Sequence, residues 1–162
     1  MPEKVCFEPI GVIHSPFLQR EGMPIQPAGA AGVRGTVEIF PQYAEGLADL
    51  DGFSHIILLY QFHQVTGASL KVRPFLDTQP RGLFATRAPK RPNPIGLSIV
   101  RLVEVEGNIV RIENVDVLDG TPLLDIKPYI PDFDQPEVTR TGWYGTAKRD
   151  VTTTRADDRF TD

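Results

Sequence analysis

The sequence contains only one cysteine among its 162 residues. A single thiol excludes an internal disulfide framework and a cysteine-based zinc site. The residue stands in the apolar run Val5-Cys6-Phe7. We therefore expect Cys6 to be a small buried hydrophobic residue rather than a reactive thiol.

Long apolar runs are also absent. No stretch approaches the roughly 18 apolar residues of a membrane-spanning helix. The first residues, Met-Pro-Glu-Lys, lack the apolar core of a signal peptide. We expect a cytoplasmic protein without a membrane partner.

The sequence lacks the alternation of strands and helices that builds a parallel sheet. No Gly-x-Gly-x-x-Gly pattern follows a strand, and there is no Walker-type phosphate loop. Short apolar segments separated by Gly and Pro instead predict a mostly-β protein, a single-sheeted closed β-barrel with one or two short helices. We expect strands at 5–14, 33–40, 54–63, 72–75, 83–86, 95–106, 109–117 and 123–126, and a helix at 41–50.

Two segments stand apart from this pattern. Residues 18–35 are rich in Gly, Pro and Ala, and a loop of this length in a small domain is usually functional or mobile. Residues 136–162 are polar, with Trp143 and Tyr144 as their main apolar anchors. We expect a barrel domain at 1–135 and a C-terminal extension at 136–162, docked on the barrel or on a partner subunit.

Positive charge is scarce overall but locally concentrated. The formal net charge of −4 argues against a protein that binds nucleic acid through its whole surface. Between Arg81 and Val103, however, there are five basic residues and no acidic one. A positive patch on an acidic body is typical of a phosphate or polyanion site. The alternative is an ordinary solvated surface cluster.

The segment Phe84–Leu97 combines this charge with rigidity. Its three prolines each fix their own φ and favour extended conformations in the residue before them. Arg87 offers a planar fork that suits a carboxylate or phosphate, although a surface ion pair is the alternative. Asn93-Pro94 can accept hydrogen bonds from an exocyclic amino group, as related loops do in adenine-N6 methyltransferases of other folds. It is also a good turn.

The remaining polar candidates are the three histidines and two turns. His14, His55 and His63 show no metal-ligand spacing, so a metal site is not expected. We interpret His55 as a structural residue, whereas His63 ends a strand where sites tend to open. The turn Asp119–Pro122 could hold a ribose or an amino group, or be a plain hairpin turn. Asp125 and Lys127 are predicted to share one strand face.

Several of these segments occur in one order that resembles a known family. The segments are Ile10–Phe17, Gly52–Ile56, Phe62-His63, Phe84–Arg87, Arg91–Gly96, Leu118–Pro122 and Asp125–Tyr129. Together they closely resemble the TrmO-type (TsaA-like) tRNA methyltransferases, in the short form without the extra C-terminal domain. The resemblance covers about three quarters of the chain. Where the long form has Pro-Arg-Gln, this sequence has Pro24-Ile25-Gln26.

The resemblance implies an S-adenosylmethionine-dependent β-barrel enzyme that works as a homodimer. Its expected reaction is methylation of the exocyclic N6 of threonylcarbamoyladenosine, next to the tRNA anticodon. Carried over to this sequence, the cofactor site would comprise Pro24, Ile25, Gln26, His63, Gln64, Arg87, Leu97, Asp119, Gly120, Thr121 and Pro122.

The same resemblance suggests how the work is divided. His63 is the candidate for assisting proton removal and Asn93 for aligning the nucleobase, which makes these two the catalytic candidates. Lys90 and Arg91 are the candidates for binding RNA phosphates. A non-catalytic S-adenosylmethionine-binding regulatory protein is the alternative. A cofactor-free RNA-binding barrel is disfavoured, since the sequence does not display the stacked aromatics of such platforms.

Overall fold

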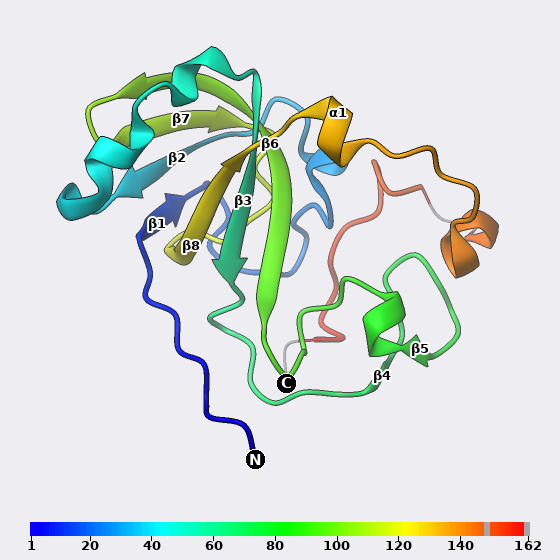
Figure 1. Ribbon diagram of the computed structural model, residues 1–162. Helices are drawn as coiled ribbons and strands as arrows, with labels where there is room; N and C mark the ends of the chain where they lie inside the picture. Colours follow the sequence, from blue (N-terminus) through cyan, green and yellow to red (C-terminus); the bar gives the residue numbers. More distant parts are fainter. Residues whose placement is uncertain (148–149, 161–162) are drawn as a thin grey trace.

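The computed structural model describes residues 1–147 and 150–160. Six strands close one antiparallel barrel in the order β1-β2-β7-β6-β3-β8 (Figure 1). The predicted mostly-β, single-sheeted closed barrel is therefore confirmed. The strands are β1 (Gly11–His14), β2 (Arg34–Ile39), β3 (His55–Gln61), β6 (Ile95–Glu106), β7 (Ile109–Glu113) and β8 (Thr121–Pro128).

The long strand β6 lets the sheet close on itself. Its first half, from Ile95 to Arg101, pairs with β3, and its second half pairs with β7. The register between β6 and β7 shifts between Leu102 and Glu104. Such a shift bends a strand and increases its twist. The strand β6 therefore pairs with β3 along its first half and with β7 along its second half as the barrel wall curves.

The barrel interior is filled by the inward-facing residues, which alternate with outward-facing ones along each strand. In β6 every second residue from Gly96 to Leu102 is buried, and β3 shows the same alternation. This period of two is what places one apolar face in the core. The fully buried aliphatic side chains of the barrel core are Ile13, Val37, Ile39, Ile56, Leu58, Val100, Val110, Ile112, Val115 and Leu123.

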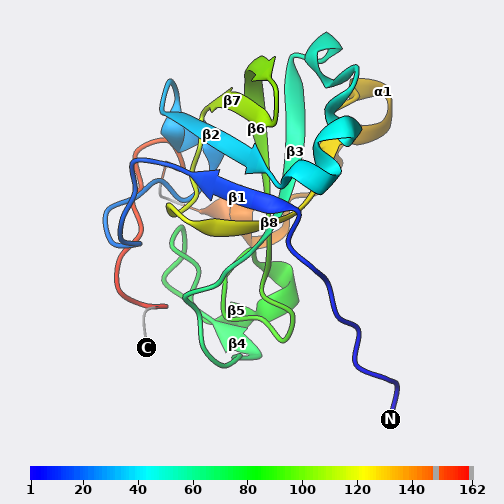
Figure 2. The ribbon, with the colours of Figure 1, turned by 90° about the vertical axis from the view of Figure 1, so that its left-hand side faces the viewer.

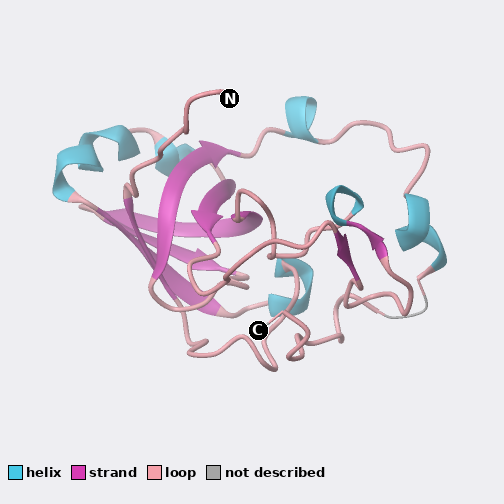
Figure 3. Ribbon diagram, turned by 90° about the horizontal axis from the view of Figure 1, so that it is seen from below, coloured by secondary structure: helices cyan, strands magenta, loops and turns pink. Residues whose placement is uncertain are grey.

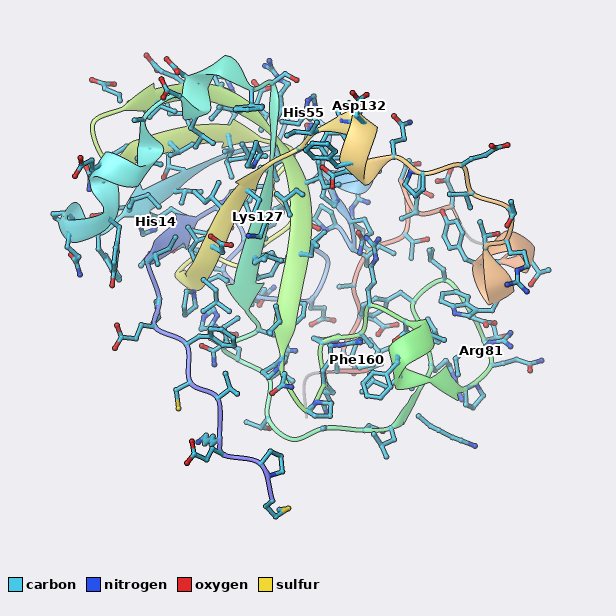
Figure 4. The ribbon with its side chains drawn as sticks, in the orientation of Figure 1. His14, His55, Arg81, Lys127, Asp132 and Phe160 are labelled. Atoms are coloured by element: carbon cyan, nitrogen blue, oxygen red, sulfur yellow. The ribbon has the colours of Figure 1, made fainter. Side chains whose placement is uncertain are left out.

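A second, smaller unit lies beside one end of the barrel (Figure 2). Strands β4 (Lys71–Val72) and β5 (Arg81–Gly82) pair there, and the 3-10 helix η4 (Leu83–Ala85) follows. Leu83 belongs to a cluster of buried apolar residues that also contains Phe160 from the far end of the chain. Phe160 lies beside η4 in Figure 4.

The remaining helices are short. The 3-10 helices are η1 (Pro27–Ala30), η2 (Pro41–Leu47), η3 (Leu50–Gly52) and η5 (Gly142–Thr146), and the α-helix is α1 (Pro131–Asp134). The helix expected at 41–50 is present as η2, which is 3-10 rather than α. No helix in the described part of the chain is long and apolar enough to cross a membrane.

Several predicted strands differ from the observed ones. The first strand begins at Gly11 rather than at residue 5, since Pro9 has no backbone N–H to donate to a neighbour. Residues 1–9 are exposed and run away from the barrel (Figure 1), so the prediction that Cys6 is buried is wrong. The strand expected at 109–117 ends at Glu113 because Asn114 adopts a positive φ of 69°.

The segment 83–86, predicted as a strand, is instead the 3-10 helix η4. Thr86 closes this helix, because its N–H and its hydroxyl both donate to the carbonyl of Leu83, at 3.0 and 2.7 Å. The apolar run Leu83-Phe84-Ala85 fits either structure by periodicity, because it is too short to show a period. The local hydrogen bonds of Thr86 are consistent with the helical choice.

The described residues of the C-terminal segment lie against the loops beside the barrel. The N–H of Gly22 donates to the carbonyl of Ala156, and the N–H of Ala156 donates to the carbonyl of Met23. The backbones of Arg155 and Pro24 also form an isolated antiparallel β-bridge. Residues 148–149 and 161–162 of the expected extension lie outside the described residues.

Candidate functional site

A cavity of about 900 Å³ opens at the end of the barrel where β3 ends and β6 and β8 begin. Its walls come from the loop after β1, the end of β3, the segment around η4, the β7–β8 connection and the C-terminal segment. Figure 3 shows these loops gathered between the barrel and the β4–β5 pair. The volume lies in the range of small-molecule and cofactor pockets.

Three buried polar side chains from three different segments meet in or beside this cavity. Ser98 of β6 donates a hydrogen bond of 2.6 Å to Oδ1 of Asp116, and the hydroxyl of Tyr60 in β3 lies 2.9 Å from the same serine. Tyr60 and Asp116 line the cavity. A hydrogen-bonded polar network therefore sits on an otherwise apolar barrel core.

Burial shifts the acidity of both ends of this network. Burial raises the pKa of Asp116 from 3.8 to about 6, against a smaller lowering effect of its hydrogen bond from Ser98. Burial also raises the pKa of Tyr60, and the negative charge of Asp116 adds to that rise. Shifts of this size in a pocket are typical of functional sites, although structural networks show them as well.

The long loop after β1 forms the wall opposite this network. Pro24, Ile25 and Gln26 line the cavity, and Nη1 of Arg87 donates a hydrogen bond of 2.9 Å to Oε1 of Gln26. This contact links the loop to the segment that follows η4. Arg87 is otherwise exposed, so most of its planar fork is available to an anionic group.

Arg20 supplies a second guanidinium to the cavity lining. Its Nη1 is buried and has no hydrogen-bond partner within the described part of the chain. Burial lowers the pKa of Arg20, although an arginine stays protonated at neutral pH. A buried donor without an acceptor is costly. A carboxylate bound in the cavity would satisfy it.

Most of the predicted cofactor residues line this one cavity. They are Pro24, Ile25, Gln26, His63, Gln64, Arg87, Leu97 and Thr121. His63 and Gln64 follow the end of β3. Leu97 lies near the start of β6, where it pairs with Leu59 of β3. The cavity thus brings together residues from four separate parts of the sequence.

The rest of the predicted turn lies outside the cavity lining. The carboxylate of Asp119 is held by Nδ1 of His14 at 3.2 Å and by the backbone N–H of Ser15. Gly120 adopts a positive φ of 78° and donates its N–H to Ile13, while Pro122 pairs with Val12. The structure therefore uses these three positions to join β8 to β1.

The two predicted RNA-binding residues have different surroundings. Arg91 lines the cavity, and its Nη1 donates to the backbone carbonyls of Thr86 and Ala88, at 2.9 and 3.2 Å. It therefore braces its own loop. Lys90 and Asn93 do not line the cavity, and the carbonyl of Asn93 accepts a hydrogen bond from Ile95. Asp125 and Lys127, predicted to share one strand face, form an ion pair at 2.9 Å.

Sequence reasoning missed two parts of the site. Ser98 and Asp116 lie in strand-like apolar runs, where a single polar residue was the only available signal. The contribution of the C-terminal segment was also missed: Thr141, Trp143, Tyr144, Val151, Ala156, Asp157 and Phe160 all line the cavity. The indole N–H of Trp143 donates to the carbonyl of Ala85 at 2.7 Å.

Metal ligands do not gather at this site. Among residues 1–147 and 150–160, no group of three or more His, Cys, Asp or Glu side chains could hold a metal ion. The cavity combines apolar walls with three arginines and a buried carboxylate. Fold and site together define a barrel protein with a cavity suited to a small organic ligand that carries an anionic group.

Comparison with known proteins specifies this class further. Residues 12–135 match the family model of the tRNA-methyltransferase O N-terminal domain. The chain belongs to this family. The resemblance stated from the sequence motifs is confirmed.

Three relatives illustrate the match. A probable S-adenosyl-L-methionine-binding protein of Pyrococcus abyssi is 53% identical over 99% of this chain and 87% of its own length. A tRNA (adenine(37)-N6)-methyltransferase of Mus musculus is 41% identical over 80% of this chain but only 32% of its own length. A crystal structure of TrmO from Pseudomonas aeruginosa is 40% identical with a TM-score of 0.73, and the match covers 86% of this chain and 62% of that one.

Proposed function

We propose that this protein is an S-adenosylmethionine-dependent methyltransferase that acts on the exocyclic N6 of an adenosine in tRNA. The finer proposal is that this adenosine is threonylcarbamoyladenosine next to the anticodon. The observation that carries the proposal is the single cavity in which most of the expected cofactor residues converge. The names of the relatives from Pyrococcus and mouse support the cofactor and the reaction, respectively.

The residues of the cavity fit the cofactor. S-adenosylmethionine combines an adenosine, an amino-acid carboxylate and a sulfonium centre that supplies a methyl group. Arg20, with its unpaired buried donor, and Arg87, with its exposed fork, are the candidates for the carboxylate. The apolar wall at Pro24, Ile25 and Leu97 suits the adenosine moiety.

The chemistry asks the protein chiefly for positioning. Methyl transfer is an in-line displacement, so alignment of donor and acceptor supplies much of the acceleration. An N6 that carries a carbonyl group has a more acidic proton and a less available lone pair, so removal of the proton assists the attack. The ring of His63 and the buried carboxylate of Asp116 are among the groups lining the cavity that can accept a proton.

The catalytic roles of His63 and Asn93 stay predictions with a direct test. Replacing either residue by alanine and measuring single-turnover methyl transfer separates chemistry from product release. A loss of rate in His63→Ala with unchanged cofactor affinity supports proton transfer by the imidazole. Unchanged single-turnover rates in both variants would remove both assignments.

The test of the proposed function uses labelled S-adenosylmethionine and two forms of the same tRNA. One form carries the threonylcarbamoyl group and the other lacks it. The expected result is label in the nucleoside of the modified tRNA alone. Label in both forms would retain the methyltransferase and overturn the finer substrate. Cofactor binding measured by calorimetry without any transfer would favour the non-catalytic alternative, which the Pyrococcus relative's name also fits.

We also propose that the protein works as a homodimer. Several aliphatic side chains on the outer face of β6 are exposed, at 37 to 48% of their surface, and Ile57 and Leu59 of β3 pair beside two of them. Contiguous apolar surface of this kind is typical of an interface. The exposed residues of β6 are Ile95, Leu97, Ile99 and Val103.

A further inference from the structure

Three aromatic side chains from two distant parts of the sequence line the cavity and are open to solvent. Phe84, in η4, is 76% exposed, and Tyr144, in η5, is 47% exposed. Trp143 is partly buried, less exposed than either of them, and packs edge-on against Tyr144, with ring centroids 6.2 Å apart. All three line the cavity described above. We call Phe84, Trp143 and Tyr144 the aromatic rim.

The rim is held in place by a specific contact. The indole N–H of Trp143 donates a hydrogen bond of 2.7 Å to the carbonyl of Ala85, the residue that follows Phe84. The C-terminal segment is thereby tied to η4. Figures 1 and 3 both place η5 beside the β4–β5 pair, from which η4 continues. Rings that stay exposed while their backbones are anchored are suited to receive a flat partner.

The charges around the rim favour an anionic partner. The guanidinium of Arg91 lies 5.8 Å from the centroid of Phe84, and Arg87 is exposed on the same loop. Two acidic residues occur among the described residues that line the cavity, and both are engaged. Asp116 accepts a hydrogen bond from Ser98, and Asp157 pairs with Arg159 at 2.6 Å.

We propose that the aromatic rim is a stacking site for unpaired bases of RNA that flank the acceptor nucleotide. This inference rests on the proposed tRNA methylation, whose site it extends. Exposed aromatics interleaved with arginines are the arrangement by which proteins bind single-stranded nucleic acid. Every base presents a flat face, so the rim selects unpaired over paired RNA rather than one sequence over another.

The proposal accounts for RNA binding by an acidic protein. A chain with a net charge of −4 gains little from its surface as a whole. Stacking depends less on salt than phosphate contacts do, because it releases few counterions. Binding through the rim therefore predicts a shallow dependence of RNA affinity on salt concentration.

The chain offers a direct probe, because Trp143 is its only tryptophan. Titrating the full-length protein with single-stranded oligoadenylate should quench the tryptophan fluorescence. An RNA duplex of the same length should quench it far less. Equal quenching by the duplex would overturn the proposal, and so would the absence of quenching by the single strand. Quenching by S-adenosylmethionine alone, with no further change on adding RNA, would reassign the rim to the cofactor.

Substitution gives the energetic test. Phe84→Ala and Tyr144→Ala should each weaken oligoadenylate binding roughly tenfold, the effect of losing one base–aromatic stack. Phe133→Ala is the matched control, because Phe133 is 78% exposed and does not line the cavity. Melting temperature should not change in the three variants, and cofactor affinity should not change in Phe133→Ala. Unchanged RNA affinity in both rim variants would overturn the proposal.

The outcome is separable from that of the proposed function. Oligoadenylate binding is measured without methyl transfer. A protein that binds the single strand through the rim but never methylates tRNA would support the stacking site and overturn the proposed methyltransferase function. If the protein methylates tRNA and the KM for RNA is unchanged in Phe84→Ala and Tyr144→Ala, the methyltransferase function is supported and the stacking site is overturned.

Discussion

The hydroxyl of Ser98 donates a hydrogen bond of 2.6 Å to the carboxylate of Asp116, and both side chains are buried. The two residues belong to different elements, since Ser98 lies in β6 and Asp116 in the connection between β7 and β8. A buried carboxylate costs free energy unless hydrogen bonds compensate it. This pair therefore makes the stability of the barrel depend on the protonation of a group that lines the cavity.

Replacing Asp116 by Asn should change how stability depends on pH. Burial raises the pKa of Asp116 from 3.8 to about 6, so the folded state binds this proton more tightly than the unfolded state does. Between pH 4 and 6, stability therefore falls as pH rises. The cost reaches about 3 kcal/mol above pH 6. Urea denaturation across this pH range should show the free energy of unfolding of the unaltered protein falling as pH rises. In Asp116→Asn the contribution of position 116 to that fall should be absent. Parallel profiles for the two proteins would contradict the assignment.

Gly96→Ala should destabilise the barrel through Tyr60. A Cβ at this position would overlap the ring of Tyr60 and approach Cζ of Phe62 to 2.9 Å. Forcing extra volume into a packed site costs about 1–3 kcal/mol. Gly82→Ala is the control, because Gly82 also lies in a strand but faces open space. Equal thermal midpoints for the two variants would show that Tyr60 gives way without cost.

Arg20→Met should weaken cofactor binding by about tenfold or more, because a charge-assisted hydrogen bond is lost. The diagnostic measurement compares S-adenosylmethionine with its decarboxylated analogue by calorimetry. The unaltered protein should prefer the carboxylate form, and Arg20→Met should lose that preference. Arg34→Ala serves as the control, since Arg34 is 86% exposed and pairs with Glu113 away from the cavity. A preference retained in Arg20→Met would assign the carboxylate to Arg87.

Lys90→Ala and Arg91→Ala should have different effects although the residues are neighbours. Arg91 braces its loop through two backbone carbonyls, so its removal should lower the free energy of unfolding by about 1–3 kcal/mol. Lys90→Ala should leave stability unchanged and weaken RNA binding uniformly across sequences. The slope of log affinity against log salt should fall by about one for Lys90→Ala. A stable Arg91→Ala with the same salt effect would make both residues phosphate contacts.

Ile99→Lys should convert the proposed dimer to monomer. Ile99 lies at the middle of the exposed apolar face of β6 and pairs with Ile57 of β3. A charge at that position would have to be buried on association. Light scattering after size-exclusion chromatography should report the loss of mass, whereas Phe133→Lys should leave the mass unchanged. A monomeric unaltered protein would remove the dimer from the proposal.

Much of the fold could be predicted from the sequence, because local patterns carry it. The strands expected at 95–106 and 109–117 leave only Gly107-Asn108 between them, which is a good hairpin turn, and the structure confirms the β6–β7 hairpin. The errors have local causes that single-sequence patterns do not show. Pro9 and the positive φ of Asn114 shorten two strands, and Thr86 converts a short apolar run to a 3-10 helix.

The site was less predictable because cavities form between segments far apart in the sequence. The loop at Pro24 and the strand end at His63 could be named through family motifs. The network of Ser98 and Asp116 could not, since a polar residue in an apolar run has the same appearance whether it is buried or exposed. The C-terminal wall could not be placed either, because a polar tail shows no periodicity that indicates where it docks.

The wall formed by Trp143, Tyr144 and Phe160 lies beyond residue 135, where the match to the family domain ends. The cavity is thus lined partly by residues inside the matched domain, Phe84 among them, and partly by residues that follow it. Substitutions in the C-terminal wall would alter the cavity and leave the barrel core unchanged, because none of Trp143, Tyr144 and Phe160 belongs to that core. The shape of the cavity can therefore change at its C-terminal wall while the barrel and the Ser98–Asp116 pair stay the same.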